Sequence, residues 1–155
     1  MTERETTRLI AWSNELRQAH ARLREALRLV RDGVHEADPQ KPGRDLLLHC
    51  RGFCTALDQH HRGEDRALFP AIEAAHPELA PVLRTLTEDH AMIDVLLTAL
   101  AEAAAGGAPP EDLDRHLDGV GAIMENHFAF EERRLLGVLE TLALDADPPE
   151  VLGRL

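Results

Sequence analysis

Apolar residues recur at intervals of three and four along most of the chain, which is the periodicity of amphipathic helices. The sequence shows neither strand-type alternation nor Asn-Gly hairpin turns. Stretches rich in proline, glycine and polar residues interrupt the helical pattern at 32–43, 76–81, 106–110 and 145–150. The pattern therefore predicts an all-α fold, an up-down-up-down antiparallel four-helix bundle with short connections.

The inward-facing stripe of each predicted helix is apolar except near its middle. Six polar residues interrupt these stripes: His20, His60, Glu64, His90, His127 and Glu131. Because an α-helix rises about 1.5 Å per residue, antiparallel packing brings all six to about one level of the bundle. The sequence thus predicts a single polar layer across an otherwise apolar core.

The two halves of the chain resemble each other in this layer. The segment "HHRGEDRAL" (60–68) matches "HFAFEERRL" (127–135), and "HARLREAL" (20–27) matches "HAMIDVLL" (90–97) more weakly. Each half therefore supplies one lone histidine and one His-x-x-x-Glu pair. Residues four apart share one face of a helix, so both members of each pair point to the same place.

Two buried carboxylates without cationic partners would cost several kcal/mol each, roughly, and bound cations remove that cost. The simplest partition is a dinuclear site with two histidines on each metal and Glu64 and Glu131 bridging. Imidazole and carboxylate ligands suit iron, manganese or zinc, and we favour iron because structural zinc prefers closed four-ligand sites. Six protein ligands leave positions for water, an oxo bridge, O2, peroxide or NO. The competing interpretation is a buried hydrogen-bonded network that specifies helix pairing.

Length and charge limit the remaining possibilities. The 155 residues suffice for one domain (1–155), with a core of about residues 5–142 and a short C-terminal tail. A net charge of −11 argues against nucleic acid and anionic membranes as partners. The chain shows no signal peptide and no run of about 18 apolar residues, so we expect a cytoplasmic protein, as a monomer or weak homo-oligomer.

Two further features bear on the second predicted helix. Cys50 and Cys54 lie one turn apart and are interpreted as reduced core residues, with a redox pair or metal site as the alternative. Pro70 removes the N–H group that would bond to residue 66, so we expect a kink just after Glu64.

Three segments carry a family resemblance. "HHRGEDRALFP" (60–70) is close to the signature H-H-x-x-E-[ED]-x-x-L-F-P, and "EDH" (88–90) and "HFAFEERRLLG" (127–137) are further matches. Over about residues 5–142 the chain resembles the hemerythrin-like, HHE cation-binding domain family of four-helix bundles with non-haem di-iron centres. The resemblance implies two iron ions, oxo- or carboxylate-bridged, on the six residues of the polar layer.

One position departs from the oxygen-carrying members of that family. They have a second histidine one turn after the residue that matches His90, whereas this chain has Asp94. The resemblance to a reversible O2 carrier is thereby weakened. Asp94 is a candidate ligand, a partner that orients His90, or a flanking residue, and His61 is the other candidate substitute or a flanking residue. Glu132 competes with Glu131 as a ligand, but the stripe and the internal match favour Glu131.

The resemblance and the ligand set together predict a non-haem di-iron protein that binds or reacts with O2, peroxide or NO, in keeping with a role in oxidative stress. One alternative is a catalase- or peroxidase-like enzyme acting on hydrogen peroxide, with Asp94 as a proton-transfer group. Others are an iron-sensing or storage module, and a purely structural metal site.

Overall fold

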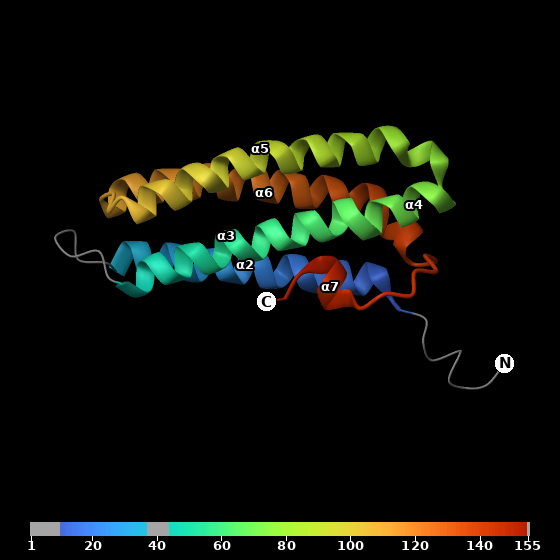
Figure 1. Ribbon diagram of the computed structural model, residues 1–155, viewed down its shortest axis with the longest axis horizontal. Coiled ribbons are helices and arrows are strands. Elements are labelled where there is room, and N and C mark those ends of the chain that lie inside the picture. The colour runs from blue at the N-terminus through green and yellow to red at the C-terminus, as the bar shows by residue number, and fades with distance from the viewer. Residues whose placement is uncertain (1–9, 37–43, 155) are drawn as a thin grey trace.

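The structure, a computed structural model, describes residues 10–36 and 44–154, and these ranges consist of helices and their connections (Figure 1). The elements are α2 (Trp12–Glu36), α3 (Arg44–Gly63), the π-helix η1 (Glu64–Leu68), α4 (Phe69–Ala75), the 3-10 helix η2 (Pro77–Leu79), α5 (Ala80–Ala105), α6 (Pro110–Leu139) and α7 (Pro148–Leu152). Because α3, η1 and α4 follow one another without a break, they act as one long helical segment. The predicted all-α bundle is confirmed.

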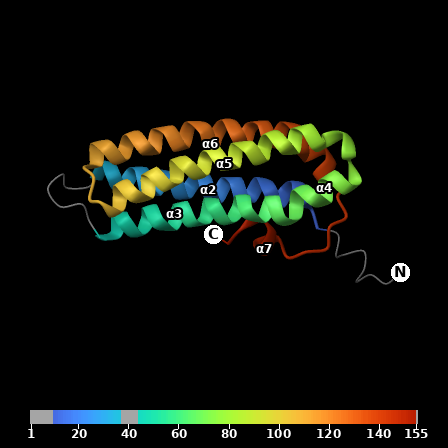
Figure 2. The ribbon, with the colours of Figure 1, turned by 45° about the horizontal axis from the view of Figure 1, so that its top comes forward.

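Four long segments lie side by side and run in alternating directions, as the two ribbon views show (Figures 1 and 2). Helix α2 packs against α3 and α6, and α5 packs against the same two helices from the other side. The short α5–α6 connection reverses the chain through Gly107, whose φ of 73° lies in the left-handed region that favours glycine. Among the described residues, no helix has the length and apolarity to span a membrane.

The apolar core forms two clusters, one on each side of the polar layer. The first cluster fills the half of the bundle that contains Leu27, Cys50 and Leu117, and the second fills the half that contains Leu16 and Ile72. Along every long segment the residues of the polar layer fall between members of the two clusters. The polar layer therefore interrupts a core that is otherwise apolar throughout. How its polar groups are satisfied affects the stability of the fold as well as the function.

The helix bounds differ most from the sequence prediction at two places. Helix α2 continues to Glu36, past the predicted start of the first connection at residue 32, because Val34 extends the buried stripe one turn beyond Val30. Helix α6 ends at Leu139, before the predicted break at 145–150. The remainder of the first connection (37–43) and residues 5–9 of the predicted core lie outside the described residues.

The irregularity expected near Pro70 takes the form of a π-helical turn just before it. In this turn the Phe69 N–H donates to the Glu64 carbonyl, five residues back instead of four. Pro70 then lies in the first turn of α4, where a missing N–H is tolerated. Such wide turns are frequent at functional sites, and this one begins at Glu64 itself.

The chain after the fourth long helix is packed on the bundle. Helix α7 lies against α2 and α3 and buries Val151 and Leu152 (Figure 1). Its close approach requires glycine at position 63, because a Cβ there would overlap the Val151 carbonyl. Gly153, whose φ is 92°, follows the last residue of α7. The C-terminal segment thus reaches the turn that carries His60.

Candidate metal centre

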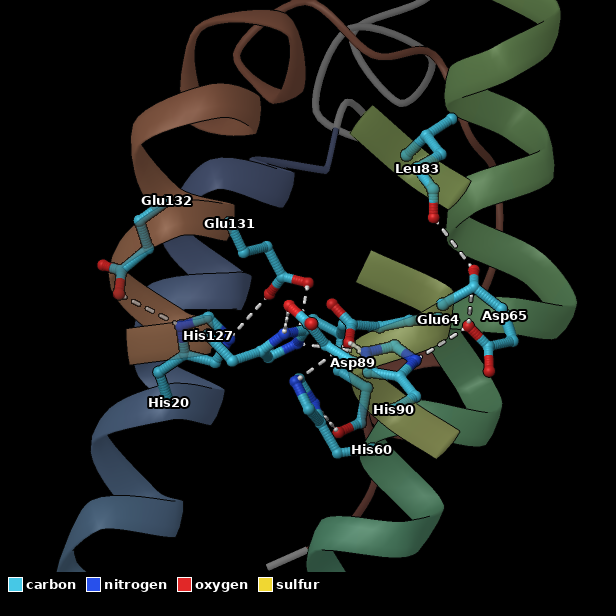
Figure 3. A network of polar contacts seen from close by, with 12 residues as sticks. His20, His60, Glu64, Asp65, Leu83, Asp89, His90, His127, Glu131 and Glu132 are labelled. Carbon is cyan, nitrogen blue, oxygen red and sulfur yellow. Dashed lines mark hydrogen bonds and ion pairs between the residues drawn. The ribbon is translucent and has the colours of Figure 1, made fainter. Parts of the chain in front are cut away.

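The six predicted polar residues converge on one region of the bundle core, from α2, α3, η1, α5 and α6 (Figure 3). Each is at most 5% exposed. Ligand-type atoms gather in two groups, and within each group they all lie within 4.8 Å of one another: His20, His60, Glu64 and Glu131, and His61, Glu64, His90 and His127. The structure therefore brings together all six residues, adds His61, and makes Glu64 a member of both groups.

Each glutamate lies between two histidines from different helices. Glu64 Oε1 is 3.4 Å from His60 Nε2 and 3.3 Å from His90 Nε2. Glu131 Oε1 is 2.8 Å from His20 Nε2, and its Oε2 is 3.8 Å from His127 Nε2. Each carboxylate thus lies between two imidazoles, but only Glu64 belongs to both groups, whereas Glu131 belongs to the group of His20 and His60 alone.

Four histidines have their outward-facing nitrogen held by a polar partner. Carboxylates of Glu132, Asp65 and Asp89 lie at the Nδ1 atoms of His20 (3.2 Å), His90 (2.8 Å) and His127 (3.2 Å), and the Leu152 carbonyl lies 2.8 Å from Nδ1 of His60. Because these oxygens accept hydrogen bonds, each Nδ1 carries the proton. The Nε2 lone pairs therefore all point into the centre, the arrangement typical of metal-ligating histidines.

Two of these lone pairs face each other. His90 Nε2 and His127 Nε2 are only 3.1 Å apart. A neutral imidazole has one N–H, and in both residues it is directed at a carboxylate, Asp65 or Asp89. Two acceptors at this distance repel each other, and a cation between them removes the repulsion.

Other inward atoms have no hydrogen-bond partner within the described ranges 10–36 and 44–154. There, the buried side-chain atoms without a hydrogen bond are Nε2 of His20, His60 and His61 and both carboxylate oxygens of Glu64 and Glu131. The 2.8 Å approach of His20 to Glu131 is short, but it lacks the alignment of a hydrogen bond. Buried polar atoms are almost always satisfied in folded proteins. Their concentration here fits a cation held by these atoms.

Burial also sets the protonation of the group. It lowers the pKa of His60 to about 3 and the pKa of His61 well below its usual value, so both imidazoles are neutral. Burial, with the nearby Glu131 carboxylate, raises the pKa of Glu64 well above its ordinary range. Burial is the largest single influence on the pKa of Glu131 and opposes its ionisation, but the contacts with His20, Glu64 and His127 together outweigh burial and lower that pKa. Neutral imidazoles are the form that binds metals, and a cation bound at Glu64 would displace the proton that burial favours there.

The secondary candidates from the sequence separate in space. His61 is 5% exposed, and its ring stacks on His90 with the centroids 3.9 Å apart. Asp94 is exposed on α5 and belongs to neither group. Glu132, the rival of Glu131, contacts His20 Nδ1 and Arg24 on the outer side of the layer. The two cysteines are free thiols outside both groups.

Sequence reasoning missed the orienting partners of the histidines. Asp65 follows Glu64, Asp89 precedes His90, and Glu132 follows Glu131, so each acid stands beside a residue of the layer and holds a histidine of another helix. These acid pairs were a visible signal in the sequence. The Leu152 carbonyl had none, because any residue type supplies a carbonyl.

The comparison with protein families agrees with this geometry. The family described as the hemerythrin HHE cation binding domain matches residues 13–139, a span that contains both groups of ligand-type atoms. Comparison with curated proteins and with solved structures finds no match.

Proposed function

The chain belongs to the hemerythrin HHE cation-binding domain family, and from this premise we propose that it is a non-haem di-iron protein that binds or reacts with O2, hydrogen peroxide or NO. Cation binding follows from the family and from the His/Glu cluster in the core. What we propose beyond this is that the metal is iron, that each chain holds two ions, and that the small ligand is O2, hydrogen peroxide or NO.

The observation that carries the proposal is the set of unpartnered inward atoms in the middle of the core. A structural hydrogen-bond network would pair these groups with one another, because an unsatisfied buried polar group costs about 1–3 kcal/mol. Instead the polar partners lie on the outer side of the histidines, where they fix the ring orientation. The inner atoms are thus arranged for ions.

We assign the two ions to the two groups. His20, His60, Glu64 and Glu131 would hold one, and His61, Glu64, His90 and His127 would hold the other, with Glu64 shared. In this assignment His61 supplies a nitrogen ligand in place of the histidine that oxygen-carrying family members have at the position of Asp94. Because each ion has three histidines or fewer and carboxylates in its ligand set, nitrogen and oxygen donors dominate, which suits iron and also allows manganese or zinc.

Iron bound at such a site supplies one-electron redox chemistry and open positions for small ligands. The chain's own residues prepare the surroundings. The Phe128 ring stacks on His20 at 3.8 Å, and the Phe69 ring lies 5.6 Å from that of His90, so apolar walls flank the layer and exclude water. Asp65, Asp89 and Glu132 hold protons on the histidine Nδ1 atoms and keep the Nε2 atoms unprotonated.

The test is to load the protein with ferrous iron under anaerobic conditions and to add O2, hydrogen peroxide or NO separately. We expect a change in the visible absorption spectrum with at least one of them. The double variant that carries both Glu64→Leu and Glu131→Leu should show no change. Oxygen evolution that continues over many equivalents of peroxide would indicate a catalase-like enzyme, whereas a single turnover indicates binding or stoichiometric reaction. An iron-loaded protein inert to all three ligands would contradict the proposal.

A further inference from the structure

A pocket of about 260 Å³ opens on the surface between α3, η1 and α5 and reaches the buried layer. His61 and His90, two members of the second group of ligand-type atoms, form part of its lining. A larger hollow, of about 540 Å³, lies beside α7 but is lined by none of the histidines or glutamates of the layer. Of these two hollows, the smaller one is therefore the one that meets residues of the layer.

The mouth of this pocket is acidic. Asp58, Asp65 and Asp94 line it together with one basic residue, Arg62. Arg62 Nε donates to Asp58 Oδ2 at 2.8 Å, so that pair is neutral as a whole. Asp65 and Asp94 then leave about two negative charges at the entrance of a protein that is itself acidic, at −11. A cleft lined by one sign of charge concentrates ions of the opposite sign.

His61 links the mouth to the interior. It lines the pocket, yet it is 95% buried, and its Nε2 has no hydrogen-bond partner among the described residues. The four other histidines of the layer each have Nδ1 fixed by an oxygen, whereas no oxygen of the part of the chain that the structure describes fixes His61 in this way. Its ring is held by stacking on His90, which constrains orientation less than a hydrogen bond does.

We propose that this pocket is the port through which ferrous iron enters the centre, with the carboxylates of Asp94 and Asp65 attracting the cation and His61 receiving it first. The inference rests on the proposed di-iron site. It gives Asp94, which is exposed and outside both groups, a role in the rate of metal entry and none in the metal's final coordination. No bond other than metal coordination forms or breaks in this step.

The test compares the rates at which metal-free wild-type protein and the Asp94→Asn and Asp94→Lys variants take up ferrous iron under anaerobic conditions. Uptake is stopped at set times with a coloured ferrous chelator that binds the remaining free iron, and final iron per chain is measured by elemental analysis. Glu102→Gln is the matched control, because Glu102 is an exposed acid on α5 two turns or more beyond Asp94 and does not line the pocket.

At low ionic strength, about 10 mM, we expect uptake to slow roughly threefold in Asp94→Asn and roughly tenfold in Asp94→Lys. Glu102→Gln, which removes the same charge farther from the pocket, should slow uptake clearly less than Asp94→Asn. At about 1 M salt, where screening is nearly complete, the rates should converge. All variants should end with the same iron content as wild type. Equal rates at low salt would overturn the port, and a lower final content in Asp94→Asn would make Asp94 a ligand and overturn it too. A wild-type protein that takes up no iron would instead refute the proposed function.

Discussion

Replacing Glu64 with leucine should stabilise the metal-free protein and remove the stabilisation that iron gives the wild type. Glu64 is fully buried, both of its carboxylate oxygens lack a hydrogen bond, and burial raises its pKa well above the usual range. In the metal-free protein this side chain therefore lowers the free energy of unfolding. In the loaded protein the same side chain belongs to both groups of ligand-type atoms, so its loss should remove the metal.

The magnitude follows from the burial. An unsatisfied buried polar group costs about 1–3 kcal/mol, and replacing buried charged groups with apolar ones of similar volume is often neutral or stabilising by about 1–4 kcal/mol. We therefore expect Glu64→Leu to raise the free energy of unfolding of the metal-free protein by about 1–3 kcal/mol. For a chain of this length that corresponds to a rise in Tm of about 2–12 °C.

Thermal and denaturant unfolding, followed by circular dichroism with and without iron, measures both effects. Iron at about one hundred times its dissociation constant should stabilise the wild type by about 2.7 kcal/mol and the variant by almost nothing. Glu102→Leu, a change of the same kind at an exposed position of α5, should alter neither quantity. If Glu64→Leu instead destabilises the metal-free protein by about 2 kcal/mol or more, Glu64 belongs to a structural hydrogen-bond network and the argument from unpartnered atoms fails.

Three further outcomes follow from the same geometry. Glu132→Gln should weaken metal binding about 10–100-fold, with little effect on the free energy of unfolding, because it loosens the ring of His20. Competition with a chelator of known affinity measures the metal affinity, and an unchanged affinity would contradict the prediction. The metal-free protein should lose stability as pH falls below about 6.5, because the unfolded chain binds protons that His60, His61 and His127, whose pKa values are lowered, do not. Each such histidine contributes a slope of about 1.4 kcal/mol per pH unit, and Glu64, whose pKa is raised, offsets one of them. A flat profile between pH 6.5 and 4 would refute this. Gly63→Ala should displace α7 and free His60 from the Leu152 carbonyl, so both metal affinity and Tm should fall. Wild-type values for both would show that α7 does not hold the His60 ring.

The helical pattern was sufficient for the bundle and for the position of the polar layer. His20, His90 and His127 each interrupt a leucine-rich stripe, and short connections leave little freedom in how the stripes align. The resemblance to the family rested on the segment 60–70, which is also the segment that the structure places at the centre.

His61 shows that a single stripe of inward residues does not describe the whole buried face of its helical segment. Leu57, His61, Glu64 and Leu68 are spaced four, three and four residues apart, so His61 fits the inward stripe of this segment as well as His60 does. The inward face is wide enough for both histidines because the segment packs against α2 and α7 on one side and α5 on the other. The π-helical turn at Glu64 adds a local change of register that no periodicity predicts.

Helix α7 was missed for a different reason. Its five residues contain two prolines and only two buried side chains, Val151 and Leu152, which is too short a run for a periodic signal. What holds it in place is the absence of a side chain at Gly63 and a backbone carbonyl on His60. Neither feature can be read from the residues of α7 alone.

The most direct measurement is the metal content of the protein after expression with iron and purification without chelator or affinity metal. Elemental analysis should find about two irons per chain, and the Glu64→Leu variant should lose most of them. A wild-type protein that is fully folded without metal, and that binds none when iron is added, would contradict the di-iron centre and leave the polar layer as a network of structural contacts.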